Sequence, residues 1–298
     1  MTRFTLPAAA AALLSVCGSA SAATILNDPS LVVWLRADTL VDDGYSGALN
    51  ATTEVWRDRT GPGFGFGDGI AHDASHSNGG PTLNATVGPN GTAILGFGAG
   101  GGFDFDGPIG VSGSAATTTF IVADYTGSGI GTGSTDARSF QIGNDGPGGS
   151  VIAYDLATPA FRFNNGNNQF RNDTLTGGFY AALFSMDAGD TYADGRFYLD
   201  GVEGTATNVG GGANMLNIVD SGYSIGRGTS AGGTDSNFAN AQIADVLVFN
   251  RVLSDPEINQ VLGYINDRYA LGTAYVPEPS RALLLLLGGL GIFLRRRR

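Results

Sequence analysis

The most constraining feature of this sequence is one segment, residues 242–271, in which a strand pattern runs directly into a helix pattern. Residues Ile243 to Phe249 form a short run of mostly β-branched and aromatic side chains, which is typical of a well-buried strand. The next residues, Ser254 to Glu257, have the composition of a helix start. Serine can cap the first free amides, the glutamate can close a capping box, and the proline between them suits the first turn.

The helix pattern that follows is amphipathic. Ile258, Leu262, Ile265 and Tyr269 fall at spacings of four, three and four residues, which places them on one apolar stripe. We therefore expect a buried strand that leads into a single amphipathic helix, and we find no other convincing helix pattern between the two ends of the chain.

The rest of the chain predicts an all-β fold. Of 298 residues, 48 are glycine and only 14% are charged, and short apolar runs recur between turn-rich segments. We predict strands at 30–36, 54–58, 92–97, 118–125, 138–142, 151–154, 160–163, 179–186, 196–199, 202–207, 223–226 and 243–249. The Asp200-Gly201 pair between two of them predicts a type I′ hairpin turn. About a dozen strands of this length form two packed antiparallel sheets, and the chain length requires only one such domain.

Four short motifs, taken in their order along the chain, resemble those of laminin-G-like and concanavalin-A-like jelly-roll domains. They are Val55 to Gly61, Gly195 to Gly201, Tyr223 to Gly226 and the turn from Asn250 to Glu257, and the resemblance covers most of residues 30–271. Each motif is degenerate by itself. The resemblance implies a two-sheet antiparallel β-sandwich with one C-terminal helix, which we place at residues 23–275.

The N-terminal 22 residues have the organisation of a secretory signal peptide. Arg3 is followed by a largely apolar stretch and then by Ala20-Ser21-Ala22, a small-residue cleavage pattern. The alternative is a lipoprotein signal that uses Cys17, although Val16 is bulky where a small residue is needed. Cleavage after Ala22 leaves an exported chain without cysteine, which must be stabilised by core burial rather than by disulfides, with a bound metal as a further option.

The C-terminal residues 276–298 have three parts. A Pro277-Glu278-Pro279 motif precedes thirteen apolar or glycine residues, 282–294, and four arginines end the chain. An apolar helix of this length spans about 20 Å, less than the ~30 Å hydrocarbon core of a bilayer. The tail resembles the PEP-CTERM sorting signal, which implies transient attachment to the inner membrane and processing by an exosortase-type enzyme. The alternative is an ordinary C-terminal tail anchor.

The charge of the region between these ends limits its partners. It contains 26 acidic residues and ten arginines, for a formal net charge of −16, and the chain has no lysine. Nucleic acid and anionic membrane surfaces are therefore poor partners, whereas neutral polymers and divalent cations remain open.

Catalytic chemistry is not indicated. A glycoside hydrolase needs two carboxyl groups that flank the scissile bond, and the Glu-x-Asp-x-x-Glu strand motif of the related hydrolases is missing. Outside the tail the chain has three glutamates, Glu54, Glu203 and Glu257, and an aspartate pair is the remaining alternative. We predict a protein that is not an enzyme.

Three other patterns are explained better by the glycine content than by function. His72 and His76 are the only histidines, and a zinc site needs more ligands. The glycines from Gly96 to Gly101 match a dinucleotide fingerprint, but no helix pattern follows them. Gly-x-Ser-x-Gly occurs around Ser224 and Ser230, but it lacks both a following helix and a later histidine.

Two candidate binding features remain. Asp104 and Asp106 stand two apart in an extended segment and supply the hard oxygen ligands that Ca²⁺ requires, although a solvated glycine-rich loop with an Asp-Gly turn is the simpler explanation. Trp56, beside Arg57, Asp58 and Arg59, is the aromatic side chain best suited to stack on a sugar ring, although the jelly-roll resemblance implies a mainly structural role for this position. Trp34 belongs to an apolar strand and is expected in the core.

Together these features predict a secreted carbohydrate-binding or adhesion domain that is sorted to the cell envelope or extracellular matrix, with extracellular polysaccharide as its partner. A structural matrix protein without a specific ligand is the main alternative. A glycoside hydrolase or lyase is the third.

Overall fold

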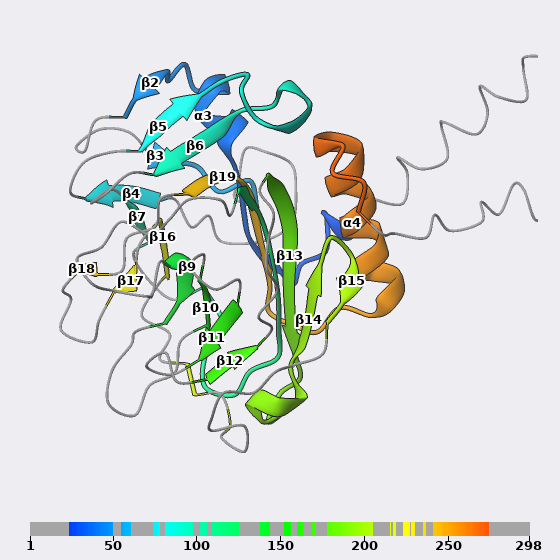
Figure 1. The fold of residues 1–298 in the computed structure, drawn as a ribbon. Coiled ribbons are helices and arrows are strands. Elements are labelled where there is room, and N and C mark those ends of the chain that lie inside the picture. Colours follow the sequence, from blue (N-terminus) through cyan, green and yellow to red (C-terminus); the bar gives the residue numbers. More distant parts are fainter. Residues whose placement is uncertain are drawn as a thin grey trace, which may run out of the picture.

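The computed structural model consists of two antiparallel sheets and one long helix near the C-terminus (Figure 1). It describes residues 24–49, 55–60, 74–77, 81–97, 102–105, 109–124, 138–143, 152–155, 160–163, 168–170, 178–204, 215, 217–218, 223–226, 228–229, 235–236 and 241–273. The predicted two-sheet sandwich with one C-terminal amphipathic helix is confirmed.

The larger sheet has nine strands. Eight follow the order β15 (Val202–Glu203), β14 (Arg196–Leu199), β13 (Phe179–Met186), β8 (Thr117–Asp124), β19 (Ala241–Phe249), β6 (Ile94–Phe97), β5 (Thr82–Asn84) and β2 (Gly47–Ala48). The ninth, β1 (Leu31–Arg36), pairs with the second half of β19, where β6 no longer does. The turn between β14 and β15 has positive φ at Asp200 (49°) and Gly201 (79°), as the type I′ prediction requires.

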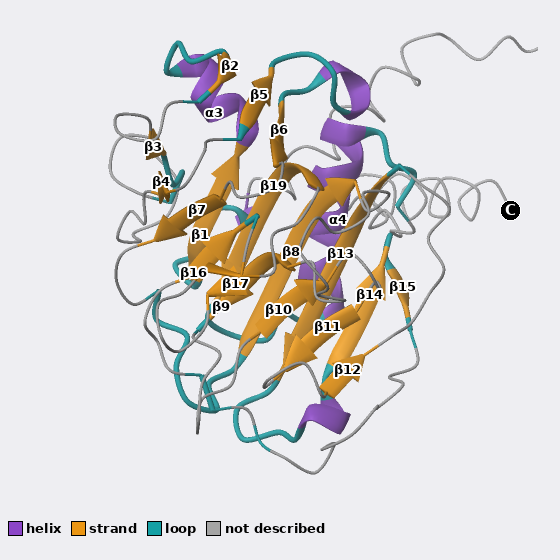
Figure 2. Cartoon of the chain, turned by 60° about the vertical axis from the view of Figure 1, so that its left-hand side comes forward, coloured by secondary structure: helices purple, strands orange, loops and turns teal. Residues whose placement is uncertain are grey.

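The second sheet has eight strands, and the two sheets lie one in front of the other in Figure 2. Its order is β12 (Asn168–Phe170), β11 (Ala160–Phe163), β10 (Ile152–Asp155), β9 (Arg138–Ile142), β16 (Tyr223–Ile225), β7 (Gly102–Phe105), β4 (Ala74–Ser77) and β3 (Val55–Trp56). A separate small ribbon joins β17 (Gly228–Thr229) to β18 (Asp235–Ser236). Strand β4 was not among the predicted strands.

The expectation of one helix was also incomplete. Besides α4 (Asp255–Tyr269), the structure contains α3 (Ala37–Asp42), which begins directly after β1, and the short 3₁₀ turns η1 (Pro89–Gly91) and η2 (Tyr192–Asp194). Helix α3 has six residues and no side-chain cap, so it is too short to show a helical period in the sequence. It is held by tertiary burial of Leu40 and Thr39.

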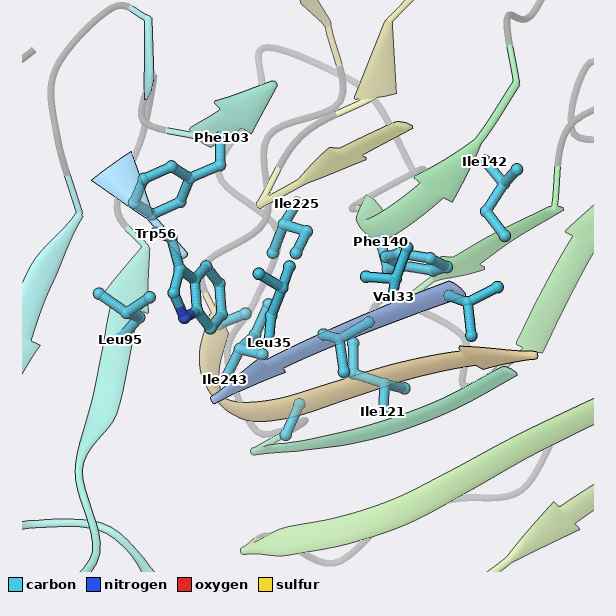
Figure 3. Packing of buried hydrophobic residues seen from close by; sticks show 14 of the residues in the cluster. Val33, Leu35, Trp56, Leu95, Phe103, Ile121, Phe140, Ile142, Ile225 and Ile243 are labelled. Atoms are coloured by element: carbon cyan, nitrogen blue, oxygen red, sulfur yellow. The ribbon is translucent and has the colours of Figure 1, made fainter. Parts of the chain in front are cut away.

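The hydrophobic core has two layers. The first lies between the sheets, where Phe103, Phe140 and Ile225 of the smaller sheet face Leu35 and Ile121 of the larger one (Figure 3). The second lies on the outward face of the larger sheet, under α4. There the predicted helix stripe of Ile258, Leu262, Ile265 and Tyr269 is buried, together with Val261.

The start of α4 has the predicted capping box, with Ser254 and Glu257 bonded reciprocally. Glu257 also receives two hydrogen bonds from the Arg251 guanidinium, at 2.8 and 3.0 Å. This hydrogen bonding lowers the pKa of Glu257 to about 2. Arg251 also pairs with Asp28, so it ties the first described residues of the chain to the start of the last helix.

Candidate functional site

The smaller sheet presents a row of mostly polar residues across its strands. In the backbone register Gln141 on β9 stands opposite Ser224 on β16, Ser224 opposite Asp104 on β7, and Asp104 opposite Ser75 on β4. On the other side Gln141 pairs with Ala153, which continues the row to Arg162 and Gln169. Neighbouring strands are about 4.8 Å apart, so the row from Gln169 to Ser75 crosses roughly 29 Å of the sheet.

The two flanking rows are mostly apolar. One contains Tyr154, Phe140, Ile225 and Phe103 in mutual register. Successive side chains of a strand point to opposite faces, so the buried Phe140, Ile225 and Phe103 place Gln141 and Ser224 on the face that points away from the larger sheet. We call this side the outward face of the smaller sheet.

The described centre of this row is polar but covered. In this row Gln141 and Ser224 are buried, at 0 and 2% exposure, as is Ser139, two residues before Gln141 on β9. The Gln141 amide Nε2 donates a hydrogen bond of 2.8 Å to the Gly143 carbonyl, which fixes the orientation of the amide. Sequence reasoning did not identify Ser139 or Gln141, because a Ser or Gln in a short strand has no distinctive spacing, and it considered Ser224 only as part of a chance Gly-x-Ser-x-Gly match.

The other flanking row explains the position of Trp56. Its backbone partner is Ala74, and the same row continues through Phe105, Tyr223 and Ile142, the last of which is buried in the core between the sheets. The Trp56 ring is fully buried and lies 5.4 Å, centroid to centroid, from Phe103. Its indole N–H donates to the Arg36 carbonyl at 2.8 Å. Neither ring face is open, so the burial of Trp56 argues against its predicted stacking on sugars.

The motif around Trp56 is structural as well. Asp58 is buried at 1% exposure, and its Oδ1 accepts the backbone N–H groups of Trp34 and Thr60, both at 2.9 Å. Trp34 is in the core as predicted, at 1% exposure. The acidic residue thus joins the segment after β3 to strand β1.

The predicted calcium ligands are only partly located. Asp104 lies in β7, between β4 and β16, whereas its side chain and all of Asp106 lie outside the described residues. Among the residues that the structure describes, no group of three or more metal-ligating side chains converges. Calcium binding stays a prediction.

The remaining sequence candidates are placed as follows. Ser224 lies within β16, between β7 and β9, and not at a strand-to-helix turn, whereas Ser230 lies outside the described residues. His76 is in β4, and His72 and Glu54 lie outside the described part of the chain. Glu203 pairs with Arg196 at 2.9 Å, and hydrogen bonding from Arg196 lowers its pKa.

The structure brings together one buried polar cluster that sequence analysis missed. Asp245 on β19 is fully buried beneath α4, where its Oδ2 accepts hydrogen bonds from the hydroxyls of Tyr264 (2.6 Å) and Tyr269 (3.0 Å). Burial raises the pKa of Asp245 to about 6. The sequence signal that could have revealed this cluster is Asp245 itself, a single charged residue within the apolar run 243–249.

Charged residues surround this cluster but pair elsewhere. Arg36 and Arg268 both form ion pairs with Asp38. The guanidinium groups of Arg36 and Arg59 lie 5.7 and 5.2 Å from the centroid of Trp34, which meets Tyr264 edge to face. Asp245 itself forms no ion pair with a described residue.

The predicted signal peptide and the sorting motif Pro277-Glu278-Pro279 lie outside the described residues. Within the described ranges, no helix has the length and apolar character needed to cross a membrane.

Comparison with known proteins gives similarity to solved structures only. No protein-family model and no curated protein matches the chain. A sialidase of Trypanosoma rangeli in complex with sialic acid is 18% identical with a TM-score of 0.47, and the match covers 87% of this chain but 39% of that one.

Two further solved structures give comparable scores. Domain 4 of AbnA, a GH43 extracellular arabinanase from Geobacillus stearothermophilus in complex with arabinotriose, is 12% identical with a TM-score of 0.46, and the match covers 78% of this chain and 98% of that domain. Botulinum neurotoxin type C, whose cell entry depends upon interaction with two ganglioside molecules, is 12% identical with a TM-score of 0.46 over 76% of this chain and 53% of the toxin. At these values no activity or ligand is transferred to this chain.

Proposed function

We propose that this chain is an exported, non-catalytic domain that binds a neutral polysaccharide on the outward face of its smaller sheet. The observation that carries the proposal is the row of polar residues from Gln169 to Ser75, flanked on both sides by mostly apolar rows. A linear sugar polymer needs hydrogen-bond partners at regular intervals along its length. Because Gln141 and Ser224 at the centre of the row are buried, we assign the sugar contacts to its outer polar members Gln169, Arg162, Asp104 and Ser75, whose residue types supply donors and acceptors.

The charge of the domain supports a neutral partner. With 26 acidic residues against ten arginines, the region 23–275 repels acidic polymers at long range. Arg196 and Arg251 form ion pairs with Glu203 and Glu257 of the same chain, so their charges are already neutralised and attract an acidic polymer only weakly.

A glycan array of the purified protein, with and without millimolar Ca²⁺, tests this function. We expect binding to neutral glycans, and we expect Arg162→Ala to weaken it at least about tenfold, because a hydrogen bond from a charged donor contributes about 1.5–3 kcal/mol. Arg196→Ala is the matched control, since Arg196 is 37% exposed and lies in β14 of the larger sheet, where it pairs with Glu203 and Asp255.

Two results would contradict the proposal. Binding that is equally strong in both variants would place the site elsewhere, and an array without any binding would favour the structural matrix protein.

Calcium binding is tested separately. If Asp104 and Asp106 hold the ion, Ca²⁺ should raise the melting temperature, and Asp104→Asn with Asp106→Asn should abolish the rise.

The sorting part of the proposal rests on the sequence of the tail. Pro277 and Pro279 cannot both lie in a regular helix or a central strand, which favours an exposed, extended segment that a membrane-embedded exosortase-type enzyme could bind. The apolar residues 282–294 would hold this segment near the inner membrane, and the terminal arginines would stay on the cytoplasmic side.

Changing Pro277, Glu278 and Pro279 together to alanine should abolish C-terminal cleavage without unfolding the sandwich. The variant should accumulate at the inner membrane, whereas the parent protein reaches the cell surface or matrix in a shortened form. Mass spectrometry of surface material decides the matter, because an intact Arg298 terminus in the parent protein is incompatible with sorting by cleavage.

A further inference from the structure

The buried polar cluster beneath α4 has a feature that neither packing nor the proposed polysaccharide site requires. Strand β19 contains a β-bulge, since its register with β8 shifts between Ile243 and Asp245. Ile243 and Val246 contact the core between the sheets, whereas Ala244 and Leu247 contact the layer under α4. The bulge inserts one extra residue into this alternation, and Asp245 thereby also faces α4.

The hydrogen bonds of Asp245 are uneven. Both tyrosine hydroxyls donate to Oδ2, whereas Oδ1 is buried and has no hydrogen-bond partner among the described residues. An ionised carboxylate in this place carries negative charge on an oxygen that is buried from solvent and accepts no hydrogen bond from a described residue, which is costly. A neutral carboxyl can still accept both tyrosine hydrogen bonds through Oδ2 and avoids that cost.

The charged and titratable groups that face Asp245 come from every element packed around it. They are Tyr264, Tyr269 and Arg268 of α4, Arg36 of β1 and Arg59 after β3, and Asp38 of α3 reaches the group through its ion pairs with Arg36 and Arg268. The arginines of this group favour an ionised Asp245, but Arg36 and Arg268 form ion pairs with Asp38 instead. Burial of Asp245 outweighs their influence.

We propose that Asp245 is a proton-responsive latch for helix α4. The helix docks most firmly when the carboxyl is protonated. When the carboxyl ionises, the last turns of α4, which carry Tyr264 and Tyr269, loosen from the sheet so that water can reach Oδ1.

The sign of the pH dependence follows from linkage. The pKa of Asp245 is raised from 3.8 to about 6 in the folded protein, so between these values the folded state binds a proton that the unfolded state has lost. The unfolding constant due to this group therefore rises about tenfold per pH unit, or roughly a hundredfold in total, as the pH rises through this window.

Chemical denaturation of the purified full-length protein from pH 4 to 8 tests the latch. The ratio of the unfolding constants of the parent protein and Asp245→Asn should rise by roughly a hundredfold from pH 4 to 7, because asparagine keeps the shape and the acceptor but cannot ionise. Asp267→Asn, which removes a charge from the exposed side of the same helix, should keep the full pH response of the parent protein.

Hydrogen exchange of the α4 amides distinguishes a latch from a general effect on stability. After correction for intrinsic rates, exchange in residues 262–269 should accelerate between pH 5 and 7 in the parent protein and remain unchanged in Asp245→Asn.

Tyr264→Phe provides a second variant if Asp245→Asn fails to fold. It removes a donor that favours the ionised form, so its transition should move to higher pH. Parallel pH profiles of parent and Asp245→Asn, or an unmoved transition in Tyr264→Phe, would overturn the latch.

Discussion

Replacing Trp56 by alanine should destabilise the folded protein by roughly 3–5 kcal/mol, the usual cost of truncating a large buried aromatic side chain. The indole is fully buried against Phe103 in the core between the sheets. Truncation also removes the hydrogen bond from its N–H to the Arg36 carbonyl, at the junction of β1 and α3. The free energy of unfolding from urea denaturation measures the effect.

Two controls separate burial from other roles of this residue. Trp56→Phe should lose less stability than Trp56→Ala, because most of the ring contact is retained. Val87→Ala should change little, since Val87 is 69% exposed. A stable Trp56→Ala protein that has lost glycan binding would restore the stacking role that the sequence suggested and contradict the burial of the ring.

The sequence predicted the parts of this fold in which local chemistry and tertiary structure agree. The β14–β15 turn requires positive φ, which Asp-Gly provides, and the capping box of α4 is a local arrangement between Ser254 and Glu257. The α4 stripe shows a helical period long enough to be recognised. The structure of such elements is determined by residues that are close to one another in the sequence.

Features that depend on distant contacts could not be predicted. The bulge in β19 is visible only in its pairing with β8, and α3 is held by burial of residues such as Leu40 rather than by its own sequence. The inward position of Trp56 follows from its register with Ala74. A register set by nonlocal pairing decides which face a residue occupies, so the candidate site could not be derived from spacing alone.

The motifs that suggested the jelly-roll resemblance occupy structural positions. Asp58 binds backbone amides of β1, and Gly226 has a φ of 80° where a Cβ would lie 2.2 Å from the Phe97 ring. Asn250 and Arg251 lead into the cap of α4. These motifs therefore identify the fold and say nothing about a ligand, which is why the fold could be predicted better than the site.

Replacing Leu262 by alanine should also have a large effect, a loss of roughly 2–5 kcal/mol in the free energy of unfolding. Leu262 is 2% exposed and lies in the layer between α4 and the larger sheet, with Trp34 and Phe120 in the same cluster. Its backbone carbonyl also accepts the hydroxyl of Thr273, which anchors the chain after the helix. Loss of the side chain therefore weakens the docking of the whole helix.

The control for this prediction lies on the same helix. Asp267→Ala removes a side chain from the exposed side of α4 and should change the free energy of unfolding by less than about 0.5 kcal/mol. Urea denaturation at pH 5, below the pKa of about 6 at Asp245, keeps the helix docked in both variants. Equal small losses would mean that α4 contributes little to the core. A large loss confined to Leu262→Ala would show that the outer layer under α4, and not only the layer between the sheets, holds the domain together.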